Sequence, residues 1–177
     1  MSTMSQDLVD PATHDAIMAA AERIKELRCK RFARDEVNQP TINNWLEAMG
    51  IDAPPYSLGR FQSGEAPPTM AQVWTMYGLA GKAGPDDPLH AMINVLTDQG
   101  FLGVLGTNSE QTYGRYLRVG EHVRVETELD SVVGPKATGM GVGYFVTSRS
   151  TWYVGDEKVA SMLFRVLKFI PKSNGGG

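Results

Sequence analysis

One short segment combines acids and an imidazole at a spacing suited to proton transfer. It reads Gly-Pro-Asp-Asp-Pro-Leu-His over residues 84–90, directly ahead of an apolar helical pattern. A carboxylate and an imidazole a few residues apart can share a water molecule and act as general base and general acid. The same run also suits an Asp-rich turn that provides the N-cap of a helix. The segment therefore predicts either a catalytic pair or a capping turn.

Other patterns that would signal a catalytic centre are missing from the sequence. The three histidines, His14, His90 and His122, are dispersed, and neither an HExxH nor a CxxC spacing occurs. No GxSxG elbow is present, and no GxGxxG follows a strand and opens a helix. The single cysteine, Cys29, lies in a predicted helix without a His and Asn constellation, so we interpret it as a bystander thiol. We therefore expect no metal and no other cofactor.

The composition fits one globular domain and argues against several classes of partner. Seventeen Lys and Arg against 20 Asp and Glu give a net charge of −3, which does not favour a sequence-general nucleic-acid binder. A length of 177 residues with 42% hydrophobic residues suits a single core. One cysteine cannot form an intrachain disulfide, which fits a reducing, cytoplasmic location. Neither a signal peptide nor an apolar run of about 18 residues is present, so no membrane span is expected.

The hydrophobic periodicity predicts helices first and strands second. Apolar residues three and four positions apart predict helices over 16–31, 42–49, 70–77 and 89–99. Thr41 and Thr69 are the expected N-caps of the second and third of these helices. From about residue 109 the period is two, which predicts strands over 122–129, 142–154 and 158–170. The expected fold is α+β, with helices packed on one face of an antiparallel sheet.

Four short segments occur in an informative order. They are Asn-Trp-Leu-Glu-Ala-Met-Gly-Ile-Asp at 44–52, Glu-Ala-Pro-Pro-Thr at 65–69, Gly-Thr-Asn-Ser-Glu-Gln at 106–111 and Tyr-Leu-Arg-Val-Gly-Glu at 116–121. In this order the chain resembles the MaoC-like, N-terminal dehydratase family over roughly residues 36–170, and most closely the MaoC-like subunits of two-component steroid side-chain enoyl-CoA hydratases. The resemblance implies a hot-dog fold, a long antiparallel sheet curled round a helix, that acts on acyl-CoA thioesters. It also implies an N-terminal helical extension (1–35), the hot-dog domain (36–171) and a linker or end segment (172–177).

The resemblance assigns catalysis in this family to an Asp and a His five residues further on, which activate water for addition to an enoyl-CoA. The Asp position falls on or near Asp52, but the chain then has Tyr56 and Ser57 where the motif has His. A tyrosine or serine hydroxyl does not replace an imidazole as a base near neutral pH. The run at 84–90 matches the Pro-Leu-His end of the motif, yet Pro85 occupies the place of the acid. We therefore expect no catalytic residue in this chain.

Loss of the pair implies a partner. We expect a homologous catalytic hot-dog subunit that pairs edge to edge into a heterodimer and then a heterotetramer, with a bulky acyl-CoA as substrate. The expected substrate-binding residues are Thr69, Trp74, Tyr77, Lys82, Arg115 and Arg118. Lys136 is a further candidate for the CoA phosphates, and Met70, Met76 and Met92 either line the substrate tunnel or belong to the core.

Two alternatives remain open. In one, Asp52 and His90 meet in space and the chain is a self-sufficient hydratase or thioesterase. In the other, the chain is a scaffold, because related subunits carry a further C-terminal domain thought to dock an aldolase. Activity of the chain alone, abolished by His90→Ala, would favour the first alternative.

Overall fold

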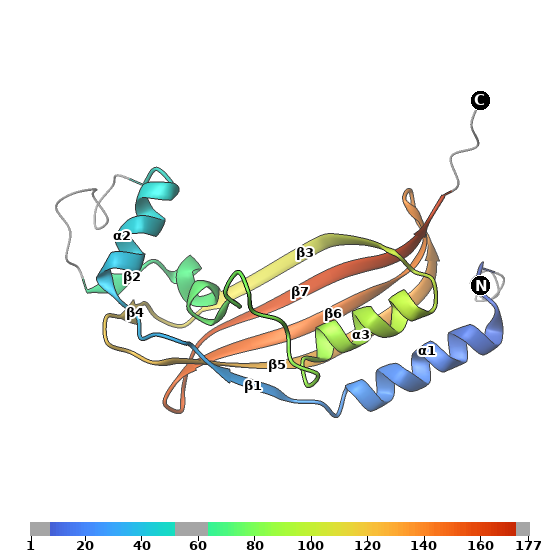
Figure 1. Cartoon of the computed structure of the whole chain (residues 1–177), viewed down its shortest axis with the longest axis horizontal. Helices are drawn as coiled ribbons and strands as arrows, with labels where there is room; N and C mark the ends of the chain where they lie inside the picture. Colours follow the sequence, from blue (N-terminus) through green and yellow to red (C-terminus); the bar gives the residue numbers. More distant parts are fainter. Residues whose placement is uncertain (1–7, 52–63, 173–177) are drawn as a thin grey trace.

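One long antiparallel sheet organises the chain in the computed structural model, which describes residues 8–51 and 64–172 (Figure 1). Its helical elements are α1 (Pro11–Ile24), α2 (Gln39–Ala48), the 3-10 helix η2 (Pro68–Thr75) and α3 (Pro88–Asp98). Its strands are β1 (Cys29–Phe32), β2 (Glu65–Ala66), β3 (Gly103–Tyr113), β4 (Leu117–Arg118), β5 (Val123–Ala137), β6 (Gly141–Val154) and β7 (Glu157–Pro171). None of the helices among these residues combines the length and hydropathy that a membrane crossing requires.

The five-stranded sheet has the order β1-β5-β6-β7-β3, and every neighbouring pair is antiparallel. The strands β5, β6 and β7 form a meander, and the turn at Gly155, whose φ is 57°, joins β6 to β7 as predicted. The short strands β2 and β4 form a separate two-stranded sheet. The predicted strands in the second half of the chain are therefore confirmed, and β5 runs eight residues further than the predicted end at residue 129.

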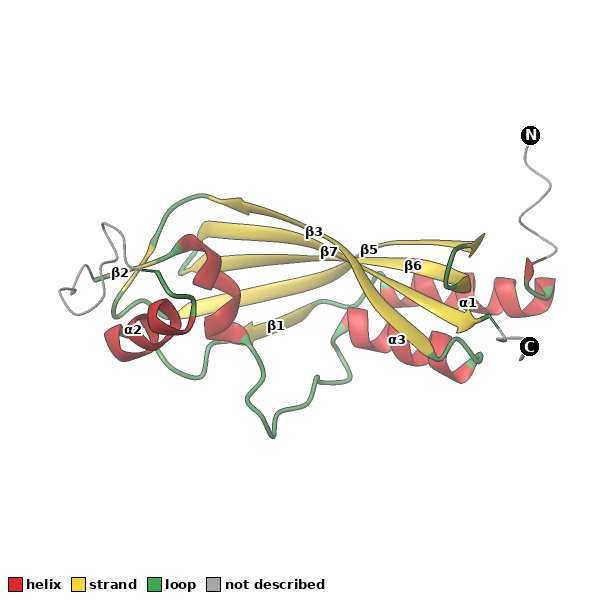
Figure 2. Ribbon diagram, turned by 90° about the horizontal axis from the view of Figure 1, so that it is seen from above, coloured by secondary structure: helices red, strands yellow, loops and turns green. Residues whose placement is uncertain are grey.

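The helices gather at the two ends of the sheet. Figure 2 shows α1 and α3 together at one end and α2 with η2 at the other. Each end has its own apolar cluster: α1 and α3 bury Ile17, Met92 and Leu96 against the sheet, while α2 and η2 bury Leu46 and Met70. The predicted α+β layout is confirmed, but the core is divided between these two clusters.

Local signals explain why α3 forms where the sequence predicts it. The carboxylate of Asp87 accepts a hydrogen bond from the backbone N–H of His90 at 3.1 Å and so caps the helix. Pro88 occupies the first turn, where its missing N–H costs no intrahelical bond. Gly100, with a φ of 89°, follows the helix in a conformation that glycine adopts without strain. The helix end is thus specified by glycine, as predicted.

The predicted helix over 16–31 is wrong in its second half. Helix α1 ends at Ile24, and Cys29 is the first residue of β1 rather than part of a helix. The reason is non-local: β1 pairs with β5, with Cys29 opposite Thr127 and Arg31 opposite Val125. The sheet therefore begins at Cys29, within the segment 1–35 that was expected to be a helical extension.

The two predicted threonine N-caps are also wrong. The side chain of Asn38 caps α2 by accepting from the N–H of Thr41 at 3.0 Å, so Thr41 lies inside the helix. Thr69 lies inside η2, which follows Pro67 without a side-chain cap. The segment predicted as an α-helix over 70–77 is a 3-10 helix that ends at Thr75, and Met76 after it is extended.

Candidate functional site

A cavity of about 340 Å³ lies between the two apolar clusters, on the face of the sheet that carries α3. Its apolar wall includes Leu89 of α3 and Trp152, Met162 and Phe164 of the sheet. Its floor includes the hydroxyl side chains of Thr127, Ser148 and Ser150. The volume is within the range of about 300–1,000 Å³ that small-molecule sites occupy. The arrangement suits an apolar ligand that carries a few polar groups.

The end of η2 and the two residues after it (75–77) are held against the sheet by three contacts. The guanidinium of Arg31 lies 3.9 Å from the ring centroid of Tyr77 and donates to the carbonyl of Thr75 at 2.6 Å. The hydroxyl of Thr75 accepts a hydrogen bond from the indole Nε1–H of Trp152 at 2.8 Å. These contacts join β1, β6 and the 75–77 segment, so they fix the wall of the cavity above its floor.

The run at 84–90 forms a capping turn beside this cavity. The buried carboxylate of Asp87 accepts from the N–H of His90 and from the hydroxyl of Tyr77 at 3.3 Å. The imidazole Nδ1 of His90 also lies 3.2 Å from the same carboxylate. Burial raises the pKa of Tyr77, and the carboxylate of Asp87 adds to that rise, so the phenol stays a donor at neutral pH. The capping interpretation of this run is confirmed.

Asp52 lies outside the described residues, as do Tyr56 and Ser57. Cys29 is buried near the acidic turn. Burial raises the pKa of the Cys29 thiol, and the nearby charges of Asp86 and Asp87 raise it further. A raised pKa disfavours the thiolate that a nucleophile needs, in agreement with a bystander thiol.

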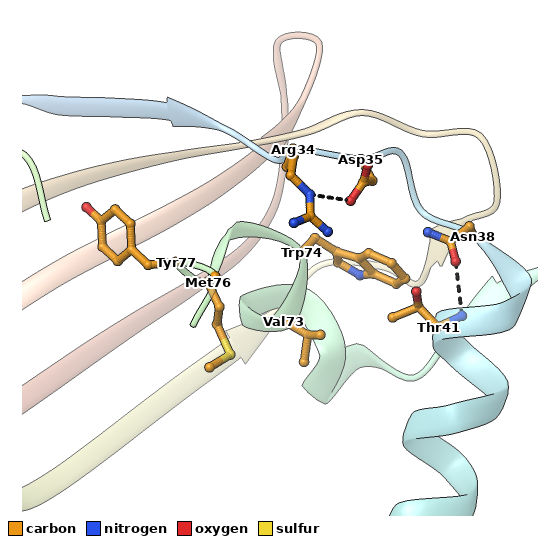
Figure 3. A pocket seen from close by; sticks show the side chains of 9 residues that line it. Arg34, Asp35, Asn38, Thr41, Val73, Trp74, Met76 and Tyr77 are labelled. Atoms are coloured by element: carbon orange, nitrogen blue, oxygen red, sulfur yellow. Dashed lines mark hydrogen bonds and ion pairs between the residues drawn. The ribbon is translucent and has the colours of Figure 1, made fainter. Parts of the chain in front are cut away.

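A second hollow, of about 250 Å³, contains Trp74 and extends to α2 (Figure 3). Arg34 lies above the indole in this view and pairs with Asp35 at 2.8 Å. The indole Nε1–H of Trp74 is buried and has no hydrogen-bond partner within the described ranges. Tyr77 lines this hollow as well as the central cavity, so two of the predicted substrate-binding residues, Trp74 and Tyr77, lie close together.

The predicted basic residues are spread over the surface. Lys82 lines a third hollow, of about 790 Å³, together with Tyr77 and His90. Arg115 is held by Glu157 through two hydrogen bonds, of 3.0 and 2.9 Å, and by Glu121 at 2.9 Å. Arg118 lies 3.5 Å from Glu65. Neither arginine lines the central cavity, and Lys136 is exposed near the end of β5.

The remaining candidates divide between surface and core. Thr69 is exposed on η2 and lines none of the three hollows. Met70 and Met92 are fully buried, one in each apolar cluster, whereas Met76 is exposed and lines the cavity. Within residues 8–51 and 64–172, no three His, Cys, Asp or Glu side chains gather in a way that could hold a metal ion.

Most residues of the cavity were not named by sequence reasoning as site residues, among them Thr127, Ser148, Ser150 and Trp152. A signal for three of them was present in the sequence. Ser148, Ser150 and Trp152 alternate along β6 and therefore share one face of the sheet. The alternation does not show which face of the sheet the helix covers. The position of α3 in the structure shows that it is the face of these three residues.

A long antiparallel sheet with helix α3 packed on one face defines the hot-dog class, which confirms the expected fold. A family model described as "FAS1-like, dehydratase domain region" matches residues 29–162. The chain belongs to this family of MaoC-like hot-dog dehydratase domains, as the resemblance indicated.

Named relatives and a solved structure agree with this assignment. The chain is 51% identical over 147 residues to the 3-oxo-4,17-pregnadiene-20-carboxyl-CoA hydratase alpha subunit of Mycobacterium tuberculosis, covering 80% of this chain and 47% of the relative. It is 34% identical over 153 residues to a probable enoyl-CoA hydratase alpha subunit of Thermomonospora curvata, covering 80% and 48%. The chain thus spans about half the length of the curated relatives it matches.

The solved structure is the crystal structure of the ChsH1-ChsH2 complex from Mycobacterium tuberculosis. The similarity has a TM-score of 0.84 at 46% sequence identity, and it covers 92% of this chain and 96% of that chain. The fold of this chain is therefore that of a subunit found within a complex of two different proteins.

Proposed function

We propose that this chain is the substrate-shaping, non-catalytic subunit of a hetero-oligomeric enoyl-CoA hydratase that adds water to a bulky, steroid-like 2-enoyl-CoA. A homologous partner chain supplies the Asp and His that activate the water. The proposal is supported by the 51% identity to a subunit named as a hydratase of a steroid-like acyl-CoA. It is also supported by the similarity to a chain that was solved in a complex of two proteins.

The observation that carries the proposal is the use of the Asp87 carboxylate. It is the acid next to the His90 imidazole, yet it caps α3 and accepts a hydrogen bond from Tyr77. A general base must present a lone pair to the substrate water. Asp87 is buried and accepts hydrogen bonds from the His90 N–H and the Tyr77 hydroxyl, and Pro85 cannot take its place as an acid. The pair at 87 and 90 therefore serves structure in this proposal.

The proposed partner binds along β3. This edge strand has 11 residues, ten of which are exposed, and Glu110 is its only charged residue. Its hydrogen bonds to β7 occupy one side of its backbone, which leaves the other side as an edge. Proteins normally protect such an edge with charges, prolines or a covering element. A second hot-dog domain that adds its own edge strand would extend the sheet, and two such pairs would form the four-chain assembly.

In this proposal the central cavity binds one portion of the acyl group. Tyr77 lines the wall of this cavity, and Trp74 lines the adjoining hollow. Lys82 is the best placed of the proposed CoA contacts, because it lines an open hollow that shares Tyr77 with the central cavity. The charge of Arg115 is already balanced by Glu121 and Glu157. We therefore assign Arg115 and Arg118 a smaller part in phosphate binding than Lys82.

A test uses the complex copurified with this chain from the parent cell. The complex carrying His90→Ala, and separately Asp52→Asn, is assayed with a steroid-like 2-enoyl-CoA and with crotonyl-CoA. We expect rates within about twofold of the unchanged complex, because neither group transfers a proton. A loss of about 100-fold or more, the usual contribution of a general acid or base, would refute the non-catalytic role.

A further inference from the structure

A row of hydroxyl groups crosses the floor of the central cavity. Thr127 of β5 lies directly opposite Ser150 of β6, and their hydroxyl oxygens are 3.3 Å apart. Ser148 lies two residues along β6 on the same face. The side chains are deeply placed, since Ser148 is 2% and Ser150 is 9% exposed. Two of the three hydroxyl side chains in this part of the sheet are therefore buried, and that of Thr127 is part-buried.

The hydroxyl row has hydrogen-bonding capacity that the described part of the chain does not use. Each hydroxyl provides one donor and two lone pairs. Thr127 and Ser150 share one hydrogen bond, so one of them donates and the O–H of the other has no acceptor among the described residues. Ser148 reaches only the carbonyl of Phe164, at 3.5 Å, which is at the limit for a hydrogen bond. Buried hydroxyl groups without full partners are costly, so a bound acceptor would stabilise this arrangement.

The row also lies where the apolar core is interrupted. One cluster includes Val125 and Trp152, and the other includes Leu129 and Val146, all on the same sheet. A domain of this size usually has one continuous core. Here the cavity and the hydroxyl row lie between the two clusters, and Phe164 on the cavity wall packs against both. An apolar ring system in the cavity would join them, and its polar substituent would meet the hydroxyls.

The charge and hydrogen-bonding groups of the cavity floor indicate which polar substituent of a ligand would bind there. Thr127, Ser148 and Ser150 are neutral. Arg31 is two register positions further along, opposite Val125, and its guanidinium contacts the Thr75 carbonyl and the ring of Tyr77. A carboxylate or phosphate at the three hydroxyls would exchange its hydration for neutral donors, because the Arg31 guanidinium in the same cavity is held at the Thr75 carbonyl and the Tyr77 ring. A ketone oxygen is neutral, accepts two hydrogen bonds and needs only the donors that are present.

We propose that Thr127, Ser148 and Ser150 bind a ketone oxygen on the ring body of the acyl group, and that this chain thereby selects oxygenated polycyclic substrates. The inference deepens the proposed function and rests on it for the nature of the acyl group. Within the hydroxyl row, Ser150 and Thr127 are the specificity-determining pair, because both line the cavity and their shared hydrogen bond uses the O–H of only one of them.

The test measures equilibrium binding of two probes to the 177-residue chain. One probe is a steroid carboxylate with a ring ketone, and the other is the same carboxylate with CH2 in place of the ketone. We expect the unchanged chain to prefer the ketone by about five- to tenfold, which is the usual value of one added hydrogen bond. The double variant Thr127→Val with Ser150→Ala should bind both probes equally, with the affinity for the CH2 probe retained.

Two controls keep the result specific. Ser150→Thr restores a hydroxyl at the same position and should keep the preference. Ser131→Ala removes a hydroxyl that bonds to Asp130 and does not line the cavity, and it should also keep the preference. The inference would be overturned if the double variant still preferred the ketone probe. It would also be overturned if the unchanged chain bound the two probes equally or bound neither. Because no turnover is measured, a failed hydratase assay of the complex would refute the proposed function while leaving this preference intact.

Discussion

The hydroxyl of Tyr77 donates a hydrogen bond to the carboxylate of Asp87 across 3.3 Å, and this contact joins the segment after η2 to the first turn of α3. Asp87 is only 6% exposed, and it also caps the helix through the N–H of His90. One carboxylate therefore fixes both the start of the helix and the wall of the cavity. The Tyr77 hydroxyl can be removed while the cap at the His90 N–H stays in place.

The first prediction separates these two roles. Tyr77→Phe removes only the phenol donor and should lower the free energy of unfolding by about 1 kcal/mol. Asp87→Ala removes the cap as well and should cost more, about 2 kcal/mol. Urea unfolding measures both. Tyr116→Phe, at a side chain that is 43% exposed, is the matched control and should have little effect. Equal losses for Tyr77→Phe and Asp87→Ala would contradict this division.

The second prediction concerns the buried contact between Trp152 and Thr75. The variant Thr75→Val keeps the shape but removes the acceptor of the indole N–H, which then stays buried without a partner. We expect a loss of about 1–3 kcal/mol in the free energy of unfolding. Thr75→Ser keeps the hydroxyl and should lose much less. If the two variants are equally stable, the hydrogen bond does not hold the cavity wall.

The third prediction is a pH dependence at the Arg115 network. Hydrogen bonds from Arg115 lower the pKa of Glu157 below its ordinary value of 4.5. A carboxyl whose pKa is lowered in the folded state adds stability above its unfolded pKa, and that stability is lost as the pH falls through the folded pKa. The unchanged chain should therefore exceed Arg115→Met in stability at pH 7, and the difference should shrink below about pH 4.5.

Chemical denaturation at a series of pH values measures this difference. Lys158→Met, which removes an exposed cation on the same strand as Glu157, is the control and should show no such convergence. A gap between the unchanged chain and Arg115→Met that stays constant from pH 7 to pH 3 would contradict the assigned role of Glu157.

The fourth prediction concerns the partner edge. Hydrogen exchange of the chain, alone and with its copurified partner, should show at least tenfold slower exchange of amides in β3 in the complex. The amides of β3 that do not bond to β7 gain partners when another strand is added. The opposite edge strand, β1, is the internal control and should change little. Protection confined to β1 would place the partner on the wrong edge for the proposed assembly.

The sequence predicts those elements that local signals specify. Helix α3 has an acidic cap, a proline in its first turn, an apolar stripe and a closing glycine, all within one short segment. The strands β6 and β7 have strong period-two patterns and a turn at Gly155. In these cases the information lies in adjacent residues, so the prediction and the structure agree.

Elements that depend on distant partners could not be predicted in the same way. The segment at Cys29 continues a helical spacing, but pairing with Thr127 of β5 makes it a strand. The hydroxyls of Ser148 and Ser150 become site residues only because α3 and the 75–77 segment cover their face of the sheet. Trp74 and Tyr77, which were expected to bind substrate, do line hollows, although the helix expected to carry both is a 3-10 helix that ends before Tyr77.

The most direct test of the account compares the hydration rate of a steroid-like 2-enoyl-CoA by this chain alone with the rate by the copurified complex, at equal concentrations of this chain. We expect the isolated chain to have less than about 1% of the rate of the complex, because the groups that activate water belong to the partner. A rate for the isolated chain equal to that of the complex would contradict it.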